Sequence, residues 1–141
     1  MERPTVGWRE WVGLPDLGIP LIEAKIDTGA RSSSIDVREV FVIENDGHDR
    51  VQFQIRLDRR RTVSAEAPIV DIRTVRNPGR GGRAEERIVI KTHLAIAGRR
   101  WPIEVNLARR TRMTYRMLLG REALADRAVV DPGASYLLGQ P

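Results

Sequence analysis

Short segments of alternating apolar and polar residues, separated by turn residues, run through almost the whole chain, and this pattern restricts the fold most. The expected strands cover residues 5–14, 21–27, 40–44, 51–57, 69–75, 87–96, 101–107, 115–119, 128–131 and 136–138. Asn45-Asp46-Gly47-His48 contains the Asp-Gly step of a tight hairpin, and Ala97-Gly98-Arg99 marks a second one. A helix is expected over residues 120–126. Many short strands with regular turns predict an all-β fold, a closed or nearly closed β-barrel with one short C-terminal helix.

Length and composition favour a single soluble domain. The 141 residues suit one domain over residues 1–141, large enough to bury a core without a metal or disulfide. The absence of cysteine excludes disulfides, thiolate nucleophiles and cysteine-based zinc sites, and is compatible with a reducing cytoplasm. Met1-Glu2-Arg3-Pro4 lacks the apolar segment of a signal peptide, and no apolar run approaches the roughly 20 residues of a membrane span. We therefore expect a cytoplasmic protein.

The charge balance narrows the choice of partners. The chain has 24 lysine and arginine residues against 19 acidic ones, a formal net charge of +5. All the cations except Lys25 and Lys91 are arginines, whose planar guanidinium holds carboxylate or phosphate groups bidentately. This excess fits an evenly solvated surface, a nucleic-acid-binding face, or recognition of an acidic peptide. Composition leaves all three open.

The triplet Asp27-Thr28-Gly29 gains its meaning from its surroundings. The expected strand over residues 21–27 presents Asp27 at its end, and the small residues that follow let the backbone approach a partner closely. Far downstream, residues 117–124 read Met-Leu-Leu-Gly-Arg-Glu-Ala-Leu, which is an apolar strand, a glycine and a helix start. The combination indicates a catalytic carboxylate rather than an ordinary turn.

This arrangement resembles one lobe of an aspartic peptidase, and in particular the retropepsins. The resemblance runs from Val6 to about Leu138 and is closest to the RimB-like retropepsins, a family also labelled ATP-dependent zinc proteases. The matching segments are residues 7–12, 14–15, 24–33, 70–76, 85–87, 103–107, 110–113 and 117–121.

The resemblance implies a retropepsin-like closed β-barrel that is active only as a homodimer, because one chain supplies one aspartate. Two facing Asp27 carboxylates would share a proton, the charged one acting as general base on water and the protonated one hydrogen-bonding the scissile carbonyl. Thr28 would brace the two loops, and Gly29 would permit the tight turn. The family's association with RimK-type glutamate ligases implies a substrate with an oligoglutamate tail, added to a ribosomal protein.

Five cations are candidates for binding such an acidic peptide: Lys25, Arg31, Arg73, Arg76 and Arg87. If the strand alternation holds, Lys25 faces the same side as Asp27, and Arg31 lies shortly after it. The other three flank residues 77–83, a glycine-rich cationic tip that the resemblance places as a flap over the cleft. Each cation could equally form an ion pair within the protein, and Glu85 and Glu86 are available for this.

The sequence predicts no metal and no cofactor. The histidines are His48, in a hairpin turn, and His93, on a strand, and they form no His-Glu-x-x-His motif. Residues 76–83 lack the residue order of a phosphate-binding loop and the helix that follows one, so neither the zinc nor the ATP of the older label is supported.

Two competing functions stay open. The protein could be a catalytically silent retropepsin-like peptide-binding module, or a basic β-barrel that binds RNA or the ribosome without chemistry. Residues 131–135, Asp-Pro-Gly-Ala-Ser, look like a degraded copy of the Asp27 loop, but proline replaces threonine, which favours a terminal turn. Trp8, Trp11 and Trp101 are expected to be core or dimer anchors rather than base-stacking platforms.

Overall fold

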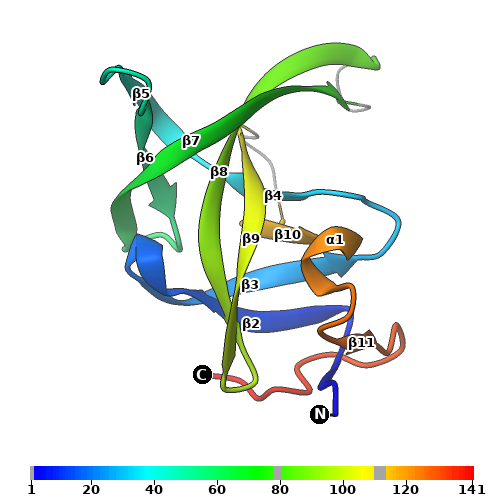
Figure 1. Ribbon diagram of the computed structural model, residues 1–141. Coiled ribbons are helices and arrows are strands. Elements are labelled where there is room, and N and C mark those ends of the chain that lie inside the picture. Colours follow the sequence, from blue (N-terminus) through cyan, green and yellow to red (C-terminus); the bar gives the residue numbers. More distant parts are fainter. Residues whose placement is uncertain (1, 78–80, 110–113) are drawn as a thin grey trace.

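The computed structural model describes residues 2–77, 81–109 and 114–141 (Figure 1). The predicted family segment 110–113 and the centre of the glycine-rich tip, residues 78–80, lie outside the described residues. The strands are β1 (Thr5–Val6), β2 (Arg9–Leu14), β3 (Ile19–Asp27), β4 (Ser33–Asp36), β5 (Arg38–Ile43), β6 (Arg50–Arg56), β7 (Thr62–Asn77), β8 (Arg83–Ile96), β9 (Arg99–Ala108), β10 (Met117–Gly120) and β11 (Val129–Val130). The helical elements are the 3₁₀ turn η1 (Pro15–Leu17) and the helix α1 (Arg121–Leu124).

The strand pairing confirms the predicted all-β barrel. A nine-stranded sheet has the order β2-β3-β10-β4-β9-β8-β7-β6-β5, and β2 also pairs with β8. That extra contact, between Gly13 and Ala95, closes a ring of β2, β3, β10, β4, β9 and β8. The strands β7, β6 and β5 continue the sheet beyond the ring, and the β7–β8 hairpin projects from it (Figure 1). Separately, β1 and β11 form a two-stranded parallel sheet.

The two predicted tight hairpins are confirmed. β5 and β6 are antiparallel, and their connection contains Asp46 at φ 34° and Gly47 at φ 79°. β8 and β9 are likewise antiparallel, connected through Ala97 at φ 51° and Gly98 at φ 72°. Two successive left-handed residues give the turn a twist that matches its strands, which explains why glycine stands second in both.

The core fills the inside of the ring. Ile22 and Ala24 of β3, Ile35 of β4 and Met117 and Leu119 of β10 are at most 2% exposed. Burying each large aliphatic side chain stabilises the fold by about 1.5–3 kcal/mol. This packing fixes the positions of β3, β10 and β4 relative to one another.

The helix α1 is attached to the barrel by a tryptophan. Trp101 of β9 is 4% exposed, and its indole N–H donates to the carbonyl oxygen of Ala123 at 2.8 Å. Its predicted role as an anchor in the core is therefore confirmed. In the described part of the chain, neither helical element has the length or apolar character to cross a bilayer.

The chain ends depart from the expected strands. The expected strand over residues 5–14 is broken at Gly7, where a Cβ would lie 2.3 Å from the carbonyl oxygen of Ala134. The expected strand over residues 136–138 is wrong, because Tyr136 adopts φ 56° and the chain turns there. In both places the C-terminal segment packs across the start of β2, a contact that local alternation does not reveal.

Glu10 holds these ends together. Its side chain is 0% exposed, and its carboxylate accepts backbone N–H bonds from Gly7 at 2.7 Å, Leu137 at 2.9 Å and Leu138 at 3.1 Å. A buried charge is tolerated when it is hydrogen-bonded in this way. The backbone N–H groups of residues 137 and 138 thus donate to a side chain of β2, and not to the backbone of a neighbouring strand.

Replacing Glu10 by glutamine is expected to lower the free energy of unfolding by about 1–3 kcal/mol, since the amide N–H₂ faces buried N–H donors that then lose an acceptor. Urea denaturation of both proteins measures the difference. Glu44→Gln, at an exposed position, is the matched control and is expected to stay within about 0.5 kcal/mol. Equal stability of the two variants would contradict a role for Glu10 in holding the C-terminal segment.

Candidate functional site

Asp27 stands at the end of β3, a strand whose side chains alternate between the core and the outside. Ala24 and Ile26 are buried, whereas Lys25 is exposed and Asp27 is half-buried. The predicted alternation is therefore confirmed, and Lys25 shares the outward face with Asp27.

The Asp27 carboxylate is oriented by the turn that follows it. Its Oδ1 atom accepts the backbone N–H of Gly29 at 3.0 Å and that of Ala30 at 3.2 Å. Thr28 and Gly29 are both exposed. A Cβ on Gly29 would lie 3.2 Å from the same Oδ1, so glycine leaves room for the carboxylate in this position. The turn fixes one carboxylate oxygen by hydrogen bonds.

Gly120 packs directly against the Asp27 loop. β10 runs parallel to β3 with Gly120 opposite Asp27, and the Gly120 N–H donates to the Ser33 hydroxyl at 3.0 Å. A Cβ at Gly120 would lie only 2.4 Å from the carbonyl oxygen of Ser32. This close approach is the reason for a glycine here, and it sets residues 117–120 directly beside the aspartate loop.

The start of α1 is hydrogen-bonded to the same loop. The backbone N–H groups of Arg121 and Glu122 donate to the carbonyl oxygens of Ala30 at 2.8 Å and Arg31 at 3.2 Å. The Arg121 guanidinium donates to the carbonyl of Gly29 at 3.2 Å. The first N–H groups of a helix have no partner within it, and here the Asp27 loop supplies the acceptors.

Two of the five predicted substrate cations form exposed ion pairs. Arg31 donates to Glu122 at 2.7 Å, and this hydrogen bond lowers the pKa of Glu122 below its ordinary value. Arg73 pairs with Glu104 at 2.6 Å and Asp71 at 2.8 Å, and these carboxylates raise the pKa of Arg73. Exposed pairs of this kind contribute about 0–1 kcal/mol each. They partly neutralise the charge that these arginines were expected to offer a substrate.

Arg87 lies inside the protein. Its side chain is 4% exposed and donates to Asn106 Oδ1 at 3.0 Å, while Asn106 Nδ2 donates to the carbonyl of Ser33 at 2.9 Å. The sequence placed Arg87 at the rim of the cleft, and its burial corrects that position. Because β8 alternates like any strand, Arg87 points inward and supports the backbone of β4 through Asn106.

Lys25 and Arg76 are the two predicted cations on the surface that form no ion pair with another described residue. Both side chains are exposed, Lys25 beside Asp27 and Arg76 on the projecting part of β7. An exposed cation that is not engaged in an ion pair keeps its charge available to a ligand. Of the five predicted cations, these two are therefore the best placed to bind an acidic peptide.

A cluster that the sequence did not reveal lies on the same face as Asp27. The guanidinium carbon of Arg9 lies 4.5 Å from the centre of the Trp8 ring and 4.7 Å from that of Tyr136, and its NH1 donates to the Tyr115 hydroxyl at 3.3 Å. The Tyr136 hydroxyl in turn donates to Glu23. The sequence offered one signal for this cluster: both β2 and β3 carry outward-facing polar side chains. Which of these side chains are neighbours can be seen only when the register of the two strands is known.

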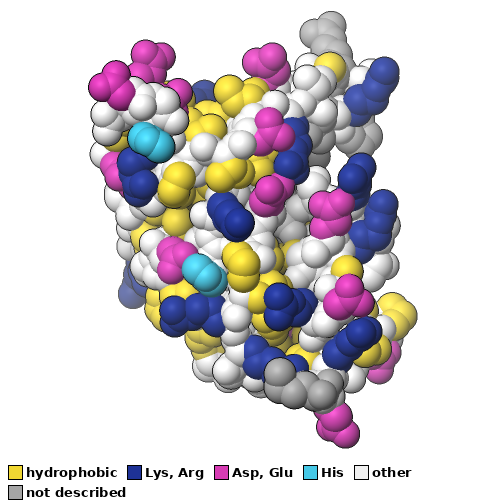
Figure 2. Space-filling model, viewed as in Figure 1, with side chains coloured by type: hydrophobic (Ala, Val, Ile, Leu, Met, Phe, Trp, Pro, Cys, Tyr) yellow, Lys and Arg dark blue, Asp and Glu magenta, His cyan; other side chains and the backbone are white. Residues whose placement is uncertain are grey.

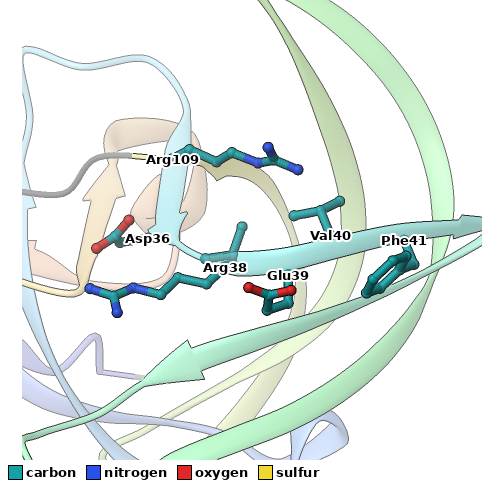
Figure 3. Close-up of a pocket in the computed structure, with 7 residues that line it drawn as sticks. Asp36, Arg38, Glu39, Val40, Phe41 and Arg109 are labelled. Carbon is teal, nitrogen blue, oxygen red and sulfur yellow. The ribbon is translucent and has the colours of Figure 1, made fainter.

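A cavity of about 470 Å³ lies elsewhere, beside the edge strand β5 (Figure 3). Its lining mixes both charges with apolar groups and does not include Asp27. The lining residues are Asp36, Val37, Arg38, Glu39, Val40, Phe41 and Arg109. The cavity is therefore separate from the aspartate loop.

Charges of both signs are interspersed over the face shown in Figure 2, so cations and acids stand close together there. Among the described residues, no group of three or more histidine, aspartate or glutamate side chains is arranged to hold a metal ion. Residues 131–135 form the expected turn, in which Asp131 Oδ1 accepts the Gly133 N–H at 3.0 Å.

Comparison with known proteins gives one family. The model of a family described as RimB-like, retropepsin-like aspartic endopeptidase RimB, matches residues 5–141. A solved structure of a Legionella pneumophila protein of unknown function, Lpg0085, superposes with a TM-score of 0.81 at 28% identity, covering 96% of this chain and 98% of that one.

The curated relatives are longer proteins. One from Desulfotalea psychrophila is 41% identical over 99% of this chain, and one from Parasynechococcus marenigrum is 40% identical over 98%. Both are named "Probable alpha-L-glutamate ligase", and in each the match covers 30% of the relative's length. The chain therefore spans less than a third of these relatives.

Proposed function

Because this chain belongs to the RimB-like family of retropepsin-like aspartic endopeptidases, we propose that it is an aspartic peptidase that hydrolyses peptide bonds in glutamate-rich peptides. The observation that carries this proposal is the position of Asp27. Its half-buried carboxylate stands at the end of a barrel strand, oriented by the Gly29 and Ala30 N–H groups and backed by Gly120. Such a carboxylate is held in place and still open to a reacting group on one side.

Catalysis requires a second copy of the chain. In the proposed homodimer, two Asp27 carboxylates face each other and share one proton. The ionised member takes a proton from water, which attacks the scissile carbonyl carbon, and the protonated member hydrogen-bonds the carbonyl oxygen. The exposed loop residues Thr28 and Gly29 suit contact with the other subunit. Collapse of the tetrahedral intermediate, with a proton delivered to the amine, releases the two products.

An acidic substrate is supported by charge and by the relatives. Lys25 and Arg76 are exposed cations without a described acidic partner, and Arg31 and Arg73 add charge nearby in exposed pairs. The relatives are named "Probable alpha-L-glutamate ligase", and a ligase that joins glutamates would make the kind of chain that such a peptidase shortens. The proposed substrate is thus an oligoglutamate tail of a ribosomal protein, made by a RimK-type ligase and trimmed in the cytoplasm.

The test is to incubate the purified protein with a peptide that ends in several glutamates and to follow the products by mass spectrometry between pH 4 and 8. Shortened peptides are expected from a protein that sediments as a dimer. A matched peptide with glutamines in place of the glutamates is expected to be cut at least about 10-fold more slowly, since it cannot form charge-assisted hydrogen bonds.

Two outcomes would replace this proposal. Tight binding of an intact peptide by the dimer identifies a silent peptide-binding module. Salt-sensitive binding of RNA, unchanged in Asp27→Asn and without any hydrolysis, identifies a basic barrel that binds nucleic acid.

A further inference from the structure

Arg9 is placed beside Lys25 by the register of the first two long strands. β2 and β3 are antiparallel with Arg9 directly opposite Lys25. Side chains of directly opposed residues share one face of a sheet and lie about 4.5–5.5 Å apart at Cβ. Since Lys25 shares its face with Asp27, Arg9, Lys25 and Asp27 all stand on the outward face of β2 and β3.

Two like charges directly opposite each other destabilise a sheet. Neither Arg9 nor Lys25 forms an ion pair with a described carboxylate. Two acids stand on the same face: Glu23 accepts the hydroxyl of Tyr136, and Asp27 accepts the N–H groups of Gly29 and Ala30 through one oxygen. The repulsion between the two cations is therefore not removed by a direct acidic contact. Local rules of this kind are broken most often at functional sites.

The Arg9 side chain is held in place by aromatic groups. Its guanidinium contacts the rings of both Trp8 and Tyr136 and donates to the hydroxyl of Tyr115. Its Nε atom is buried without a hydrogen-bond partner among the described residues, and Nη1 is bonded to Tyr115. Nη2 is therefore the nitrogen that can receive a carboxylate. The hydrogen bond with Tyr115 also raises the pKa of Arg9, which favours its charged form.

We infer that Arg9 and Lys25 form a carboxylate-binding subsite, which receives a glutamate side chain of the substrate next to the peptide bond that faces Asp27. This inference rests on the proposed function and names the residues that choose its substrate. Lys25 lies two residues before Asp27, a distance of about 6–7 Å along a strand. An extended peptide has the same spacing, so a side chain within two positions of the scissile bond reaches the subsite.

The subsite explains why the cations nearest in sequence to Asp27 are not equivalent. Arg31 is directed to Glu122, whereas Lys25 is directed outward with a second, pre-positioned cation beside it. A fixed guanidinium loses little conformational entropy on binding, which strengthens the contact. The expected specificity is for glutamate over glutamine at one position, instead of a general attraction to acidic peptides.

The test uses two peptides that differ only by glutamate or glutamine beside the cleaved bond. Cleavage is measured as kcat/KM, and binding is measured by titration calorimetry in proteins that also carry Asp27→Asn. Arg9→Gln is expected to lower the glutamate-to-glutamine preference at least about 10-fold in both measurements. Lys25→Gln, at an exposed position, is expected to act in the same direction. Arg99→Gln, an exposed cation at the start of β9, is the matched control and is expected to keep the wild-type preference.

The outcomes separate the subsite from the peptidase. If wild-type protein cuts the peptides and both variants keep its preference, the subsite is disproved and the peptidase stands. Arg9 has only a structural role if Arg9→Gln lowers kcat/KM and binding equally for both peptides, while Lys25→Gln keeps the wild-type preference for glutamate over glutamine. A third outcome is that neither peptide is cut, but the glutamate peptide binds more tightly than the glutamine peptide, and this difference in binding is lost in Arg9→Gln and Lys25→Gln. The subsite is then supported and the peptidase is disproved. Absence of binding to either peptide overturns the subsite.

Discussion

Replacing Asp27 by asparagine is expected to abolish hydrolysis of a glutamate-rich peptide, with a fall in kcat of about 10²–10⁴-fold or more. The carboxamide can neither share a proton with a second Asp27 nor act as general base on water. The fold is expected to persist, because the amide oxygen can still accept the N–H groups of Gly29 and Ala30 that now bond to Oδ1. Peptide cleavage and circular dichroism, measured on the same preparation, check both parts.

The chain supplies its own control for this variant. Asp131 stands in a similar turn, where its Oδ1 accepts the Gly133 N–H at 3.0 Å. Asp131→Asn makes the same chemical change outside the proposed site and is expected to leave kcat unchanged. Full activity of Asp27→Asn, or loss of activity in Asp131→Asn alone, would show that the catalytic carboxylate has been misassigned.

Replacing Gly120 by alanine is expected to be the most destabilising conservative change near the site. The new Cβ would lie 2.4 Å from the carbonyl oxygen and 2.6 Å from the carbonyl carbon of Ser32, and 2.9 Å from the carbonyl oxygen of Ala30. These are backbone atoms that cannot rotate away, so the loop after Asp27 must shift. We expect a loss of about 1–3 kcal/mol or more in the free energy of unfolding, together with loss of cleavage.

Urea denaturation and the peptide assay measure both effects of Gly120→Ala. The matched control is Gly133→Ala, where the Cβ would lie 3.5 Å from Asp131 Oδ1, an ordinary contact. That variant is expected to change stability by no more than about 0.5 kcal/mol. If Gly120→Ala were as stable and active as Gly133→Ala, the close packing of β10 against the loop would not be needed for the site.

The site's backbone could be predicted because its signals are local. The alternation that ends at Asp27 identifies the strand and the face of Lys25, and the glycine between an apolar run and a helix start identifies the partner segment. By contrast, β4 (Ser33–Asp36) was missed, since its sequence Ser-Ser-Ile-Asp is polar although all of it is buried. Its hydroxyl at Ser33 and backbone are satisfied by Gly120 and Asn106, which lie far away in the sequence.

The roles of the cations could not be read from the sequence for a related reason. Arg73 meets Glu104 across a neighbouring strand, and Arg87 turns inward to Asn106. Which residue faces which is set by strand register, and a shift of one residue reverses every face. The same applies to Arg9, which becomes a neighbour of Lys25 only when β2 and β3 are paired.

The position of β10 determines when the surroundings of Asp27 can be completed during synthesis of the chain. β10 lies between β3 and β4, two strands of the first 36 residues, and pairs with both. Until residues 117–120 have been synthesised, the ring cannot close and the Asp27 turn has no Gly120 or α1 behind it. Long-range strand pairing of this kind is formed late in folding. In an unfinished chain, the Asp27 turn thus lacks the two elements that hold it in the finished fold.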